Sequence, residues 1–146
     1  NVETGGGTMT KERIFAVLAA LSVTGCMPAP ETGVEARAED GAQFYAAYCT
    51  SCHGAGARGD GPLAGDLSVP PADLTRLAAG NGGVFPYAAA MARIHGYPGQ
   101  FHEMPQFGPL LDGPRVTWHD PATGETVETP RALLALARYL ASIQRG

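Results

Sequence analysis

The sequence predicts an all-α domain with a small β-hairpin inserted before its last helix. Three stretches carry this prediction. Apolar residues recur at helical spacing over 131–143, a helical pattern runs over 40–48 directly before a pair of cysteines, and residues 115–128 alternate around a D-P-A-T-G turn. The chain has 146 residues, the size of one domain, and its 20 glycines and 12 prolines predict long loops between the helices.

The last helix is the most clearly specified element. We expect Thr129 to cap it and Pro130 to occupy its first position. Its core-facing stripe consists of Leu133, Leu136, Ala137, Leu140 and Ile143. Arg131, Arg138 and Arg145 recur every seven residues on another face, which we expect to be solvated rather than to dock an acidic partner.

Two further elements follow from local patterns. Pro86 suits the first turn of a helix and Gly96 its end, and Met91 then lies on the core face between them. In the hairpin, Val116 and Trp118 point to one side, and we expect Trp118 to anchor the hairpin on the core. A role for Trp118 at the functional site is the alternative.

The first 25 residues are predicted to be upstream sequence and a signal peptide. Lys11 and Arg13 precede a ten-residue apolar run over 14–23, which is too short to span a bilayer, and small residues then lead to Cys26. This layout resembles a bacterial lipoprotein signal, which implies that Cys26 is lipidated and anchors the exported chain to a membrane. An ordinary signal peptide with an incidental cysteine is the alternative. Residues 1–8 precede Met9 and play no part in the fold prediction.

The remaining chain divides into a tether and a domain. Residues 26–38 are rich in proline, alanine and glutamate and lack aromatic residues, so we expect a flexible tether there. Residues 39–146 form the predicted domain. Of the three cysteines, lipidation of Cys26 leaves Cys49 and Cys52, and none is then left for a structural disulfide elsewhere.

Cys49, Cys52 and His53 form a C-x-x-C-H motif, which has three interpretations. A zinc site needs four ligands, yet there is no second cysteine pair, and the other histidines are scattered. A thioredoxin-like dithiol follows a strand, whereas a helix is predicted before Cys49. Covalent haem attachment fits best, because two thiols at this spacing reach the two vinyl groups of one porphyrin and the histidine reaches its iron.

From Glu39 to Arg145 the chain resembles the class I c-type cytochromes, in particular their small bacterial periplasmic monohaem members. The matching residues, in chain order, are Gly41 and Tyr45 in the first helix, Cys49, Cys52 and His53 in the attachment motif, Pro62 in the following loop, Met104 with Pro105, and Tyr139 in the closing helix. The resemblance implies about four helices around one covalently attached haem c.

It also implies two roles around the iron. Met104 lies in a loop flanked by proline and glycine, 51 residues after His53, and matches the methionine that binds the second axial position. His102 is the rival ligand. Pro62 matches the residue whose carbonyl accepts a hydrogen bond from the axial histidine, with Pro70 or Pro71 as alternatives.

The net charge of the chain limits the kinds of partner it can bind. From Cys26 onward there are 8 arginines, no lysine and 12 acidic residues, so the net charge is 8 − 12 = −4. No basic groove for nucleic acid is present. An acidic carrier predicts redox partners with a basic face. As an electron carrier it is expected to have no small-molecule substrate.

We therefore expect a non-enzymatic, membrane-tethered electron carrier on the periplasmic side, free or as the cytochrome subunit of a respiratory oxidase or dehydrogenase. The rival is a haem enzyme or gas sensor in which the sixth position of the iron is open.

Overall fold

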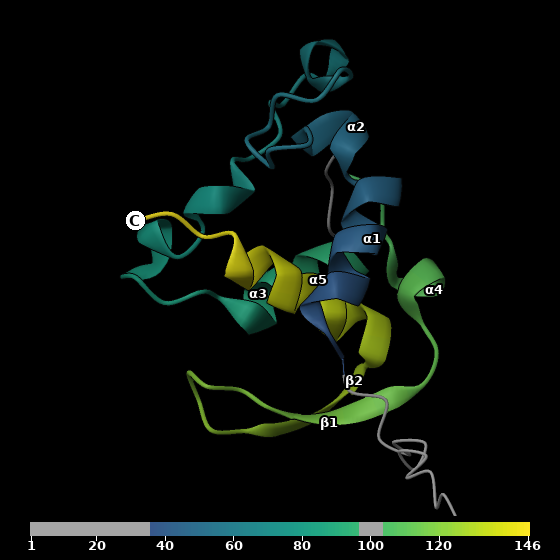
Figure 1. Ribbon diagram of the computed structural model, residues 1–146, viewed down its shortest axis with the longest axis vertical. Helices are drawn as coiled ribbons and strands as arrows, with labels where there is room; N and C mark the ends of the chain where they lie inside the picture. The colour runs from purple at the N-terminus through teal and green to yellow at the C-terminus, as the bar shows by residue number, and fades with distance from the viewer. Residues whose placement is uncertain (1–35, 97–103) are drawn as a thin grey trace, which may run out of the picture. The chain divides into compact units, whose positions relative to one another are not determined.

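The computed structural model describes residues 36–96 and 104–146. Contacts divide the chain into two units, Asn1–Thr32 and Gly33–Gly146, and every described residue lies in the second. Cys26 and His102 therefore lie outside the described residues. Within the described part, no helix has both the length and the apolarity needed to cross a bilayer. The described residues form five α-helices and one two-stranded sheet, arranged as in Figure 1, so the prediction of a helical domain with a small hairpin before the last helix is confirmed.

Two helices form the centre of the domain. Helix α1 spans Ala38–Tyr48 and crosses α5, which spans Arg131–Ser142 (Figure 1). The crossing depends on Gly41, because a Cβ atom there would collide with the carbonyl oxygen of Ala135 in α5. The absent side chain lets the two backbones touch.

The buried side of α5 is wider than the predicted stripe. The predicted residues are inward-facing, with Ile143 half-buried, and Leu134 and Ala135 are also about 1% exposed. Helix α5 is therefore covered by α1 on one side and by α3 and the hairpin on others. A helix covered on several sides buries more residues than a single amphipathic stripe contains.

The start of α5 differs from the prediction. Thr129 makes no cap, and Pro130 precedes the first helical residue, Arg131. The reason is the hairpin: Thr129 and Pro130 are the last residues of β2, where they pair with Val116 and Arg115. The chain passes from strand to helix without a loop, and a backbone bond from Arg131 N to the Pro114 oxygen (2.8 Å) fixes the junction.

The hairpin itself forms as predicted. Strand β1 (Arg115–His119) pairs antiparallel with β2 (Thr126–Pro130), with Trp118 opposite Val127. Trp118 is 7% exposed, and its ring lies 5.4 Å from that of Tyr87, measured between centroids. This contact with α3 supports the anchoring role of Trp118.

The remaining elements are short except for α3. Helix α3 spans Tyr87–His95 between Pro86 and Gly96, as predicted, and buries Met91. The others are α2 (Thr50–His53), the 3-10 turns η1 (Ala64–Asp66), η2 (Leu74–Arg76) and η3 (Ala79–Asn81), and α4 (Gly108–Leu111).

The domain begins earlier than predicted. Ala36, which the sequence placed in the tether, is 1% exposed, and its carbonyl accepts a hydrogen bond from Arg138 Nη1 (2.5 Å). Arg131 contacts Asp40 in α1 through an ion pair of 3.3 Å. Of the three regularly spaced arginines, Arg131 therefore binds α1 and Arg138 binds the segment just before it, so their face of α5 is not simply solvated.

The α1–α5 crossing gives the first prediction. Replacing Gly41 with alanine forces the two backbones apart, and we expect it to lower the free energy of unfolding by about 1–3 kcal/mol, the usual cost of overpacking. Gly65→Ala is the matched control, because a Cβ atom there has nothing within 4 Å. Denaturant unfolding of both variants measures the difference. Equal stability of the two would contradict the close crossing.

Candidate haem-binding site

The C-x-x-C-H motif forms one helical turn at the end of α1. Cys49 caps α2, and backbone bonds from the nitrogens of Cys52 (3.3 Å) and His53 (2.8 Å) reach the Cys49 carbonyl oxygen. Residues three and four apart are neighbours on a helical turn. The two thiols and the imidazole are thus gathered on one turn, and all three side chains are half-buried.

The two cysteines do not form a disulfide. Burial, and secondarily the neighbouring Cys52, raises the pKa of Cys49 to about 11. A dithiol oxidoreductase needs the opposite, a lowered pKa that supplies thiolate near neutral pH. A zinc site is not supported either, since the described residues contain no group of three or more His, Cys, Asp or Glu side chains that could hold a metal ion.

The imidazole of His53 is held by a loop carbonyl. Its Nδ1 atom lies 3.0 Å from the carbonyl oxygen of Ala72. A carbonyl can only accept, so Nδ1 carries the proton and Nε2 keeps the lone pair that can bind a metal. The acceptor is Ala72 and not Pro62, which corrects the prediction. Pro62 is exposed, whereas Ala72 directly follows Pro71, one of the alternatives.

Ala72 is itself fixed from two directions. The Asp73 carboxylate accepts hydrogen bonds from the backbone nitrogen (2.9 Å) and hydroxyl (2.6 Å) of Thr75, which start η2 and lower the pKa of Asp73. Gln144, beyond α5, donates to the Leu74 oxygen (2.7 Å) and accepts from Ala78 N (2.8 Å). Gln144 thus connects the end of the closing helix to the loop that orients His53.

Sequence reasoning missed these supporting residues. Asp73 and Thr75, two residues apart, are typical of an Asx turn, and this local signal was available in the sequence. Gln144 gave no such signal, because its contacts lie about 70 residues away along the chain.

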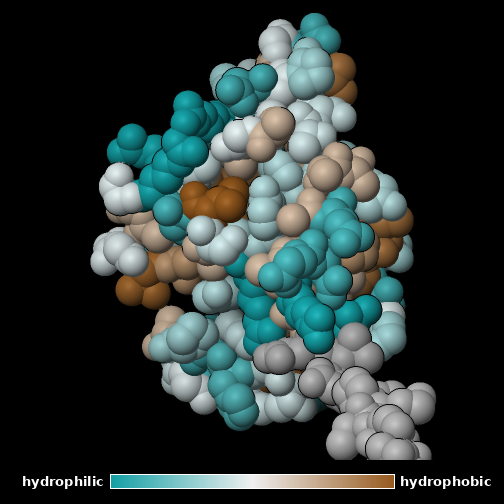
Figure 2. All heavy atoms as spheres, in the orientation of Figure 1, coloured by the Kyte–Doolittle hydropathy of each residue, from teal (hydrophilic) through white to brown (hydrophobic). Residues whose placement is uncertain are grey.

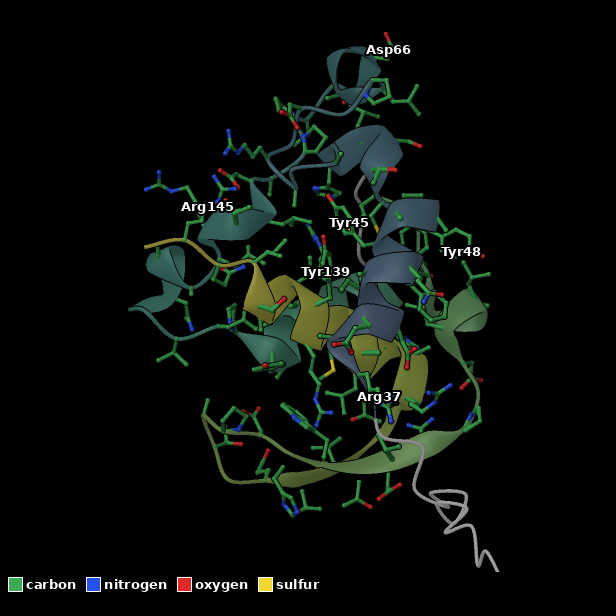
Figure 3. The ribbon with its side chains drawn as sticks, viewed as in Figure 1. Arg37, Tyr45, Tyr48, Asp66, Tyr139 and Arg145 are labelled. Atoms are coloured by element: carbon green, nitrogen blue, oxygen red, sulfur yellow. The ribbon has the colours of Figure 1, made fainter. Side chains whose placement is uncertain are left out.

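Tyr45 contacts the turn from α1. It is 2% exposed, and its hydroxyl donates to the Gly54 carbonyl oxygen at 2.6 Å. Burial raises the pKa of Tyr45 well above its ordinary value, so the hydroxyl stays a donor. Figure 3 shows Tyr45 beside Tyr139 of α5, with 5.3 Å between ring centroids, while Tyr48 lies on the other side of α1.

Met104 lies in the segment before α4. It is half-buried and packs against the hydrophobic core, as do Cys49 and Phe107. The segment is tied to α3 by a backbone bond from Phe107 N to the Ile94 oxygen (3.0 Å), and Gln106 side-chain atoms occupy the space beside Gly96. By contrast, Met91 is 7% exposed within α3, as expected of a packing residue.

A separate groove lies between α3 and the hairpin. Its volume is about 420 Å³, and its lining includes His95, Trp118, Asp120 and Glu128. None of Cys49, Cys52, His53 and Met104 lines it, so it is distinct from the C-x-x-C-H site.

A C-x-x-C-H turn with an oriented imidazole, set against a helical core, is the arrangement of a c-type cytochrome. The model of the family described as cytochrome c oxidase, cbb3-type, subunit III matches residues 36–118, which run from the start of the domain into β1. The chain belongs to this family and is a haem-based electron-transfer cytochrome. No curated protein and no solved structure matches the chain.

Haem c is the cofactor that the family implies, and the described donors fit it. Cys49 and Cys52 are free thiols, and the His53 tautomer leaves Nε2 for the iron. Met104 adds a neutral sulfur donor whose side chain is half-buried beside the same core.

The Ala72 contact gives the second prediction. Pro71→Ala loosens the chain before the Ala72 carbonyl, because proline restricts the backbone of its own residue and of its neighbour. A weaker bond to Nδ1 makes the imidazole less basic. We therefore expect the reduction potential to rise, whereas Pro62→Ala leaves it unchanged. Potentiometric titration of both variants checks this, and a larger shift for Pro62→Ala would restore Pro62 as the supporting residue.

Proposed function

We propose that this protein transfers single electrons through one haem c. In this proposal Cys49 and Cys52 would hold the haem covalently, and His53 and Met104 would be the ligands of its iron. The observation that carries the proposal is the His53–Ala72 hydrogen bond of 3.0 Å, because it fixes the metal-binding nitrogen on the same turn as two free thiols.

Bound haem supplies an iron that cycles between the ferrous and ferric states. The residues of the chain set the conditions for that cycle. Ala72 holds the proton on His53 Nδ1, which makes the ring a better donor. The thioether of Met104 carries no charge, and a histidine–methionine pair raises the reduction potential. Tyr45, 2% exposed, and the half-buried Cys49 limit the access of water to that side of the turn.

The third prediction tests the axial methionine. In Met104→Ala we expect the weak long-wavelength band of a ferric methionine–iron bond to disappear and the reduction potential to fall, since a stabiliser of the ferrous state is lost. The haem itself should stay attached, as checked by peroxidase staining of a denaturing gel.

Met91→Leu is the control, because Met91 is buried in α3 and the swap conserves volume. It should keep the band. A wild type without the band, or a Met104→Ala variant that retains it, contradicts the assignment and favours a haem enzyme or gas sensor with an open sixth position.

For partners, we propose redox proteins with a basic docking face, with the chain acting as a free carrier or as the cytochrome subunit of a respiratory oxidase or dehydrogenase. The net charge of −4 supports this. Figure 2 shows hydrophobic residues on the viewed face as separate spots among hydrophilic ones, and such a surface suits an encounter steered by charge rather than by a broad apolar patch.

We also propose that the chain is exported and held on the periplasmic side of a membrane by lipid on Cys26. The sequence pattern before Cys26 supports this, and the segment 26–35 would connect the lipid to the domain that begins by Ala36.

The fourth prediction tests the anchor. In Cys26→Ser we expect the protein to leave the membrane fraction and appear in the soluble periplasmic fraction, because the lipid-accepting thiol is gone. Fractionation followed by haem staining measures this. The control is Thr24→Ser, which keeps Cys26. Membrane retention of the Cys26→Ser variant would indicate an anchor of another kind.

A further inference from the structure

The hydroxyl of Tyr45 makes a hydrogen bond in addition to the packing of its ring. Tyr45 is 2% exposed, and its hydroxyl lies 2.6 Å from the carbonyl oxygen of Gly54. A buried hydroxyl requires a partner. Here that partner belongs to the residue directly after His53, so the bond joins α1 to the end of the haem-binding turn.

The Gly54 carbonyl is the centre of a small network. It also accepts from the Ala57 nitrogen at 3.1 Å, so both of its lone pairs are used. Gly54 has a φ of 75°, and a Cβ atom there would collide with the Asp60 carboxylate, so this position requires glycine, the residue with the greatest backbone freedom. The hydrogen bonds from Tyr45 and Ala57 therefore hold a carbonyl that its own residue leaves free to turn.

The network returns to His53 through the loop. Ala57 is 0% exposed and has a φ of 58°, a left-handed conformation that costs a non-glycine residue energy and persists only where the surroundings impose it. Its carbonyl accepts from Leu74 N at 2.8 Å, two residues after Ala72, the residue that holds His53 Nδ1. These contacts thus link the backbone directly after His53 to the segment whose carbonyl binds His53 Nδ1.

We propose that Tyr45 is a positioning residue for the axial histidine: its hydroxyl fixes the backbone after His53 and so holds the imidazole against the Ala72 carbonyl. This inference rests on the proposed role of His53 as an iron ligand. It assigns to Tyr45 an action through hydrogen bonding, in addition to the packing of its ring against Tyr139.

Tyr139 supplies the matched control. Its ring lies 5.3 Å from that of Tyr45, centroid to centroid, so it shares the packing. Among the described residues, no hydrogen bond joins the Tyr139 hydroxyl to α2 or to Gly54. Removing one hydroxyl or the other therefore separates the hydrogen bond from the aromatic contact.

The test compares Tyr45→Phe with Tyr139→Phe in the haem-loaded protein. By NMR, the His53 Nδ1 proton should exchange with solvent about fivefold faster in Tyr45→Phe, the factor that corresponds to a net hydrogen bond of about 1 kcal/mol. The reduction potential should rise with it, because a loosened imidazole is a weaker donor. Tyr139→Phe should leave both unchanged.

Two results would overturn the inference: unchanged exchange and potential in Tyr45→Phe, or equal changes in the two variants, which would mean that only the packing of the rings matters. Unfolding measurements on both variants show whether a change is local to His53 or follows from general loss of stability. The wild-type spectrum tests the proposed function separately. If that spectrum lacks the methionine–iron band, Met104 is not a ligand, and the comparison of His53 Nδ1 exchange in the two tyrosine variants still holds.

Discussion

The hydrogen bond between His53 and the Ala72 carbonyl is the constraint to which the rest of the domain is adjusted. It joins residues 19 apart in the chain, so the intervening loop must fold back onto α2. The loop does this through close backbone contacts: Gly59 leaves no room for a side chain beside the Pro71 carbonyl, and Gly61 has none beside Ser51, whose oxygen would lie 2.5 Å from a Cβ atom. Orientation of one imidazole thus explains why small residues recur in this loop.

The elements that could be predicted from the sequence are those whose signals lie within a few residues of the element itself. Helix α3 lies between Pro86 and Gly96, and the hairpin forms around its D-P-A-T-G turn, because these signals act within a few residues. The C-x-x-C-H motif is local in the same sense. Its spacing brings the two thiols and the imidazole together on any helical turn.

What the sequence could not predict depends on backbone atoms or on distant segments. Any residue offers a carbonyl, so nothing in the side chains distinguishes Ala72 from Pro62 as the acceptor for His53. Thr129 has the side chain of a helix cap, yet its pairing with Val116 keeps it in β2. Gln144, just beyond the end of α5, bonds to Leu74 and Ala78, which lie about 70 residues earlier in the chain. Tertiary contacts decided each of these three cases.

The same dependence links the core of the domain to the proposed redox centre. Gly41 lets α1 and α5 touch, and this crossing places the Tyr45 ring against Tyr139. The hydroxyl of that ring then reaches the turn that carries His53, while Gln144 reaches the opposite side of the same site from the end of α5. A change at the crossing therefore acts from two directions on His53, the proposed iron ligand. Since the reduction potential follows the geometry and basicity of that ligand, the packing of two helices becomes a determinant of electron transfer.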